Sequence, residues 1–273
     1  MTYARLFDSS FPFVLLGVGA LAGGCDDSSR APGAGPSASS SALPAMASAP
    51  AAMAPPSATA TASAKPEGPS MKEYAEPAPD RLGKLAPGLG IAVGQRAPDA
   101  EVHDATGKPI HLADLYKKSA VLLAFYRGGW CPYCSYEIHD FAQSFAEYQR
   151  RGVTPVAISV DKEDEASKTQ ATFAITFPVL SDPDLHAINS FHVAHKADDA
   201  EYAKLKGYGL ELEKWSGRAH HTIAVPSYFL VDTKGVVRWA HADPEYKVRP
   251  KTAQLLAAID AAKLSPPAPV LPR

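Results

Sequence analysis

The chain has 273 residues, three cysteines and a formal net charge of −2. So small a net charge gives no electrostatic basis for binding nucleic acid or an anionic membrane surface, and we expect no nucleic-acid partner. The length allows one or two domains, but the composition is uneven, so the folded part is expected to be shorter than the chain.

The first 25 residues are typical of an export signal. Arg5 precedes an apolar segment, residues 11–21, which is too short to span a bilayer and suits the core of a signal peptide. Small residues and Cys25 follow, and the whole segment (1–25) resembles a bacterial lipoprotein signal, in which this cysteine is acylated. The resemblance implies export to the bacterial cell envelope and membrane anchoring at Cys25, on the periplasmic or outer face. The alternative is an ordinary secretory signal with an unrelated cysteine.

Residues 26–84 are predicted to form a disordered tether. The stretch 26–70 is mostly Ala, Ser and Pro, so it cannot bury enough apolar surface to offset the entropy of ordering. A flexible segment directly after Cys25 would give an anchored domain its reach. The folded domain is predicted over residues 85–265, with a flexible tail at 266–273.

Hydrophobic patterning predicts strands and helices that alternate along the domain. Continuous apolar runs indicate strands buried on both faces, and apolar side chains at helical spacing indicate helices packed on a sheet. In chain order the predictions are a strand at residues 119–126, a helix at 132–151, a strand at 153–161, helices at 163–174 and 184–191, strands at 227–232 and 236–241, and a helix at 250–263. The segment 195–221 shows no clear pattern. This order predicts an α/β domain with a central mixed β-sheet flanked by helices.

Cys131 and Cys134 form a Cys-Pro-Tyr-Cys pair between a predicted strand and a predicted helix. A thiol at a helix N-terminus loses its proton more easily, because unpaired N–H groups and the helix dipole stabilise negative charge. We therefore expect Cys131 to be the nucleophile, with Arg127 adding positive charge, and Cys134 to form a disulfide with it. Two structural cysteines are the alternative. A zinc site would need two further ligands, and no metal or cofactor is expected.

Six short motifs are spread along the domain. They are the turn at residues 94–99, the hairpin at 104–108, the segment 112–115, the active-site run 125–134, and the segments 177–182 and 229–232. Together they resemble the alkyl hydroperoxide reductase / thiol-specific antioxidant (AhpC/TSA, peroxiredoxin-like) family of the thioredoxin-like superfamily. The resemblance implies a thioredoxin-like fold, a thiol-dependent oxidoreductase and a thioredoxin-like electron donor.

Two further positions follow from this resemblance. Val225 and Pro226 resemble the cis-proline position of thioredoxin folds, where the loop packs beside the cysteines and offers backbone groups to a substrate. From their places beside the cysteines, Trp130 and Tyr133 are expected to flank the mouth of the site, with a core position as the alternative. Two departures stand out, because typical peroxiredoxins carry a proline and a threonine or serine where this chain has Ala124 and Gly128. Their active-site arginine would align near Pro226, so Arg127 is the candidate for the missing charge.

Three functions remain open at this point. A peroxiredoxin-like enzyme would reduce a hydroperoxide at Cys131 through a sulfenic acid, which Cys134 would then resolve. A thiol–disulfide oxidoreductase would act on protein disulfides with the same two cysteines. A copper(I) delivery module would hold the metal with both thiols and a histidine. The family resemblance favours the hydroperoxide.

Overall fold

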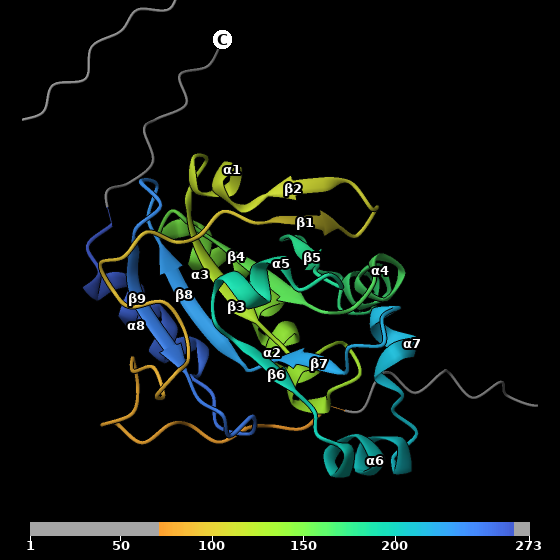
Figure 1. The fold of residues 1–273 in the computed structure, drawn as a ribbon. Coiled ribbons are helices and arrows are strands. Elements are labelled where there is room, and N and C mark those ends of the chain that lie inside the picture. The colour runs from red at the N-terminus through yellow and green to blue at the C-terminus, as the bar shows by residue number, and fades with distance from the viewer. Residues whose placement is uncertain (1–70, 265–273) are drawn as a thin grey trace, which may run out of the picture. The chain divides into compact units, whose positions relative to one another are not determined.

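The computed structural model describes residues 71–264 (Figure 1), so the predicted signal with Cys25, the stretch 26–70 and the tail lie outside the described residues. Seven strands form one sheet in the order β2-β1-β5-β4-β3-β8-β9. Their bounds are β1 (Glu101–Asp104), β2 (Pro109–His111), β3 (Ala120–Phe125), β4 (Val153–Ser159), β5 (Val179–Ser181), β8 (Ser227–Val231) and β9 (Val237–Ala242). Strands β3, β4 and β5 are mutually parallel and the other pairings are antiparallel, which confirms the predicted mixed sheet.

Helices cover both faces of this sheet. Their bounds are α1 (Leu112–Tyr116), α2 (Pro132–Gln143), α3 (Phe145–Arg150), α4 (Glu163–Thr172), α5 (His186–Ser190), α6 (Asp199–Gly207), α7 (Leu212–Ser216) and α8 (Thr252–Ala261). Leu122 and Ala124 of β3 face the core that α2 and α8 cover, while Val121 and Leu123 face the core under α1 and α5. Because successive side chains of a strand point to opposite faces, burial on both sides explains the continuous apolar run. Among residues 71–264, no helix is long and apolar enough to cross a membrane.

One predicted helix is divided in the structure, and one predicted strand contains a proline. The helix predicted over residues 132–151 is divided into α2 and α3 at Ser144, whose φ of −97° and ψ of 7° leave the helical region. Strand β4 contains Pro155, although it lies inside the sheet. Pairing of β4 with β5 begins only at Ala157. At Pro155 no β5 residue lies opposite, so no hydrogen bond is lost through the missing N–H of the proline.

The segment 195–221, which no pattern assigned, adds a small unit between α5 and β8. Strands β6 (Ala194–Lys196) and β7 (Thr222–Ala224) pair antiparallel as a second sheet, and α6 and α7 connect them. Each strand has only three residues, too few for an alternating pattern to be recognised.

Residues 71–84 are the one clear correction to the predicted boundaries, because they are predicted as tether and pack on the domain instead. Tyr74 is only 3% exposed. Arg81 Nη2 lies 2.5 Å from Asp243 Oδ2, which is itself buried. The Ala, Ser and Pro composition ends near residue 70, and the aromatic and charged side chains after it provide these contacts.

Candidate active site

Cys131 lies where β3 has ended and α2 begins. It is the N-cap residue of α2, with φ of −86° and ψ of 118°, and Pro132 occupies the first turn, where no N–H is needed. Its own N–H donates to the Gly128 carbonyl at 3.1 Å, and its carbonyl accepts from the Ser135 N–H at 2.9 Å. The local sequence therefore places the Cys131 sulfur at the helix N-terminus, as predicted.

The Gly128-Gly129 turn before the cysteine depends on the absence of side chains. The Gly129 N–H donates to Oδ2 of Asp161 at 2.7 Å, and burial raises the pKa of this carboxyl to about 7. Gly128 has a φ of +148°, and a Cβ there would lie 2.3 Å from Trp130 Nε1 and 2.7 Å from Asp161 Oδ1. The threonine or serine that peroxiredoxins carry at this position would therefore not fit without moving the turn.

The Cys131 thiol is acidified by its surroundings. A hydrogen bond from the Cys134 thiol, together with the positive charges of Arg249 and Arg127, lowers the Cys131 pKa to about 6 although burial opposes this. At neutral pH the thiolate, which is the nucleophilic form, therefore predominates. The predicted contribution of Arg127 is present, and Arg249 adds a second charge that the sequence analysis did not identify.

Cys134 is completely buried, and both cysteines are free thiols in this structure. Burial raises the pKa of the Cys134 thiol, as does the hydrogen bond that it donates to Cys131. Arg249 Nη2 lies 3.2 Å from the Cys134 sulfur and works in the opposite direction, since a cation stabilises the thiolate. The two thiols therefore differ in pKa, and Cys131 ionises first. This order fits the predicted roles of Cys131 as nucleophile and Cys134 as resolving cysteine.

Arg249 belongs to a buried polar cluster behind Cys134. Its Nη1 donates to Oε2 of Glu137 at 2.6 Å, and its Nε donates to the Tyr246 carbonyl at 2.9 Å. Glu137 also accepts a hydrogen bond from the Tyr228 hydroxyl. Burial raises the Glu137 pKa, and the charge of Arg249 counteracts part of this effect. Both members of the Arg249–Glu137 ion pair are fully buried, so neither charge can be removed without leaving the other unpaired.

Sequence reasoning missed this cluster for two different reasons. Glu137 lies on the apolar face of the predicted helix, three residues after Cys134, and an acid on such a face is a recognisable signal. Arg249 lies 115 residues after Cys134, beyond the last strand, and no local pattern indicates that it returns to the site. Peroxiredoxins carry an active-site arginine at the position that aligns near Pro226, where this chain has none. Arg249 supplies a positive charge to the site from a different part of the chain.

Arg127 lies on the other side of the motif and is also buried. Its guanidinium carbon is 5.1 Å from the Trp130 ring centroid and 4.2 Å from that of Tyr246, distances typical of cation–π contacts. Its Nη2 is 3.5 Å from Oε1 of Glu201 in α6. The structure thus brings together Arg127 and Trp130, two of the predicted site residues.

Val225 and Pro226 line a hollow of about 110 Å³ beside Arg127 and Tyr246. The loop therefore lies next to the site as the resemblance implied. However, the Val225 N–H already donates to the Val193 carbonyl at 2.8 Å, and the Val225 carbonyl accepts from the Ser227 hydroxyl at 2.8 Å. The Val225 N–H is therefore not free for a substrate in this conformation, whereas the carbonyl has a second lone pair that can still accept a hydrogen bond.

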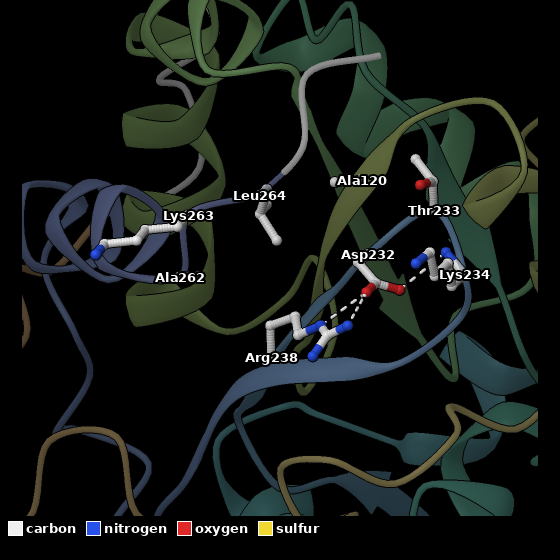
Figure 2. Close-up of a pocket in the computed structure, with 8 residues that line it drawn as sticks. All are labelled: Ala120, Asp232, Thr233, Lys234, Arg238, Ala262, Lys263 and Leu264. Atoms are coloured by element: carbon white, nitrogen blue, oxygen red, sulfur yellow. Dashed lines mark hydrogen bonds and ion pairs between the residues drawn. The ribbon is translucent and has the colours of Figure 1, made fainter. Parts of the chain in front are cut away.

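A second hollow of about 250 Å³ lies at the opposite end of β3 (Figure 2). It is lined by Ala120, Asp232, Thr233, Lys234, Arg238, Ala262, Lys263 and Leu264. Two of its charged groups, Arg238 and Asp232, are paired with each other, with Arg238 Nη2 at 2.6 Å from Asp232 Oδ2. Ala120 is the first residue of β3 and the cysteines follow the last, so this hollow is remote from the thiols.

Copper(I) binding finds little support at the cysteines. The Arg249 guanidinium occupies the immediate surroundings of the Cys134 sulfur, and a fixed positive charge there disfavours a metal cation. Within residues 71–264, no three His, Cys, Asp or Glu side chains are grouped so that they could hold a metal ion.

Comparison with known proteins identifies the family. The model of the AhpC/TSA family matches residues 93–240, more than half of the chain. The peroxiredoxin bcp of Helicobacter pylori (strain ATCC 700392 / 26695) is 30% identical over 147 residues, which cover 54% of this chain and 85% of that protein. The thiol-disulfide oxidoreductase ResA of Bacillus subtilis is 31% identical over 105 residues, 38% of this chain and 58% of ResA.

Two solved structures share the fold. Reduced Prx3 of Vibrio vulnificus in complex with H2O2 has a TM-score of 0.51 at 18% identity, covering 62% of this chain and 99% of Prx3. Peroxidoxin BcpB of Mycobacterium tuberculosis has a TM-score of 0.50 at 22% identity, covering 63% of this chain and 97% of BcpB. At such identities they establish the fold alone, and they confirm the predicted thioredoxin-like architecture.

Proposed function

Because the chain belongs to the AhpC/TSA family and is a thiol-dependent oxidoreductase, we propose that it reduces hydroperoxides at Cys131. One observation carries the proposal: Cys131 is acidified to a pKa of about 6 and yet is only 1% exposed. A thiolate so enclosed is reactive at neutral pH but accessible only to a small oxidant. The reacting end of a hydroperoxide is of that size, whereas a protein disulfide must approach the sulfur together with its polypeptide.

The two cysteines suffice for the reaction. The Cys131 thiolate attacks the terminal oxygen of the hydroperoxide, the O–O bond breaks, and the alcohol or water leaves after taking up a proton. Cys131 is now a sulfenic acid. The Cys134 sulfur, in the first turn of the helix that Cys131 caps, attacks it, the S–O bond breaks, and water leaves as the disulfide forms. Arg249 contacts Cys134 and would stabilise the thiolate that this second step requires.

The disulfide must then be reduced, and we assign this to a dithiol protein of the thioredoxin-like class. One thiolate of such a donor attacks a sulfur of the disulfide, and its second thiol releases the mixed disulfide, so both cysteines return to thiols. The two-cysteine chemistry and the family support this class of donor.

A thiol–disulfide oxidoreductase acting on protein disulfides is the second candidate. The Cys-x-x-Cys spacing and the similarity to ResA favour it. The internal pairing of the Val225 N–H and the burial of Cys131 argue against it, because an extended substrate would need both to be free.

Rapid mixing of the reduced protein with hydrogen peroxide tests the proposal. We expect Trp130 fluorescence to report Cys131 oxidation far faster than for a free thiol at the same pH, since Trp130 adjoins the site. Reduction of insulin disulfides, measured in parallel, is expected to be slow. A peroxide rate no better than that of a free thiol, with fast insulin reduction, would establish the second candidate instead.

We further propose that the protein is exported to the bacterial cell envelope and anchored by lipid at Cys25. The support is the signal-like composition of residues 1–25 and the Ala/Ser/Pro-rich stretch that follows. Expression in a bacterium with radiolabelled palmitate should label the wild-type protein in the membrane fraction and leave Cys25→Ser unlabelled. Equal labelling of both, or none in either, would contradict the anchor.

A further inference from the structure

Residues 72–76, which we call the strap, lie against the first turn of the active-site helix (Figure 1, orange). The Lys72 N–H donates to the carbonyl of Pro132, inside the Cys-Pro-Tyr-Cys motif, at 3.1 Å. Tyr74 is buried, and its ring contacts Tyr136 of α2 edge to face at 5.6 Å between centroids. The strap is thus fixed to the helix that carries both cysteines.

The strap is also paired with the loop at residues 243–249, which we call the lid loop. The Ala75 N–H donates to the Lys247 carbonyl at 2.8 Å, and the Arg249 N–H donates to the Ala75 carbonyl at 2.9 Å, as in a parallel strand pair. Beyond the lid loop, Lys251 Nζ lies 2.7 Å from Oε1 of Glu73. These contacts hold the lid loop from its outer edge.

The lid loop crosses the cysteine motif from one side to the other. At one point the Tyr246 ring lies over the Arg127 guanidinium, at 4.2 Å, and meets the Tyr133 ring edge-on at 5.7 Å. At the other, Arg249 reaches the Cys134 sulfur at 3.2 Å. Arg127 precedes Cys131 and Tyr133 follows it, so Tyr246 bridges the residues on both sides of the nucleophile.

We propose that the strap is a specificity element, which latches the lid loop over Cys131 and thereby restricts the oxidising substrate to hydroperoxides. The inference rests on the proposed function and explains how a thioredoxin-like Cys-x-x-Cys site would discriminate against disulfides. With the strap in place, Tyr246 stays between Arg127 and Tyr133 and Cys131 stays enclosed. With the strap released, the lid loop loses its only strand-like pairing among the described residues, and larger disulfides gain access.

The test compares two oxidants on the reduced full-length protein: hydrogen peroxide and oxidised glutathione. Glutathione reacts by thiol–disulfide exchange, in which the Cys131 sulfur forms a mixed disulfide and a glutathione thiolate leaves. Tyr74→Ala removes the buried ring that fixes the strap. We expect the ratio of the glutathione rate to the peroxide rate to rise about tenfold, because local opening becomes more frequent. Tyr208→Ala, at a tyrosine that is 69% exposed on the C-cap of α6, is the matched control and should leave the ratio unchanged.

A second variant guards against misfolding of the first. Ala75→Pro removes the N–H that binds Lys247 but keeps the Tyr74 ring, and it should raise the same ratio. Ratios equal to wild type in both strap variants would overturn the strap proposal and leave peroxide reduction intact. A wild-type peroxide rate equal to that of a free thiol would overturn the proposed function whatever the strap variants do.

Discussion

Replacing Cys131 with serine is expected to abolish hydroperoxide reduction, with a loss of about a thousandfold or more, because the only other thiol of the site, Cys134, is fully buried and its pKa is raised by that burial. Cys134→Ser is the matched variant, one helical turn away, and it should behave differently. A serine hydroxyl can replace the Cys134 thiol as a hydrogen-bond donor to Cys131, and the charges of Arg249 and Arg127 remain, so the first oxidation should still occur once per molecule. Turnover should then stop, since no second sulfur can form the disulfide.

The measurement that separates the two variants is a single-turnover experiment with equal peroxide and protein. Mass spectrometry should detect sulfenic acid at Cys131, or its trapped adduct, in Cys134→Ser and no oxidation of Cys134 in Cys131→Ser. The reverse pattern, with oxidation retained in Cys131→Ser, would exchange the roles of the two cysteines. That outcome would also conflict with the burial of Cys134, which raises its pKa.

Much of the fold could be predicted because its signals are local. The apolar run that became β3 and the helical spacing of α2 both depend on residues close in sequence, and both are confirmed. The same holds for the β8–β9 hairpin, whose two strands flank a short turn. The division of α2 from α3 and the small β6–β7 sheet depend on packing, which no periodicity in so few residues reveals.

For the site too, only the residues that are close in sequence could be predicted. Cys131, Cys134 and Arg127 lie within eight residues of one another, and their proximity follows from a strand that leads into a helix. Arg249 and Tyr74 arrive from opposite ends of the domain, because β9 and the strap bring them back to α2. Both residues reach the site through tertiary contacts, which no local pattern predicts. Tyr74 also follows directly on the Ala/Ser/Pro-rich stretch and is therefore assigned to the predicted tether.

Arg249→Met is expected to have the second largest effect, and on two properties at once. Methionine replaces the apolar stem of the side chain but leaves the fully buried Glu137 without its cation, which should destabilise the fold by about 3–5 kcal/mol. The same change removes a positive charge that lowers the Cys131 pKa. A thiol with a higher pKa is less ionised at a given pH, so the reaction with peroxide at pH 7 should slow.

Alkylation of the reduced protein with iodoacetamide measures the second effect. In the wild type the rate should rise with pH around a midpoint near 6, where the Cys131 thiolate forms, and in Arg249→Met that midpoint should move upward. Arg238→Met, which breaks the half-exposed pair with Asp232 far from the cysteines, should leave the midpoint unchanged.

The double variant Arg249→Met, Glu137→Gln distinguishes packing from charge. With both charges removed, no ion is left unpaired in the core, so thermal stability should recover in part while the alkylation midpoint stays high. A midpoint that returned to the wild-type value in the double variant would mean that Glu137, and not the loss of Arg249, raises the Cys131 pKa. A midpoint unchanged in Arg249→Met would leave the acidity of Cys131 to the Cys134 hydrogen bond, to the helix N-terminus and to Arg127, and Arg249 would then be a structural residue only.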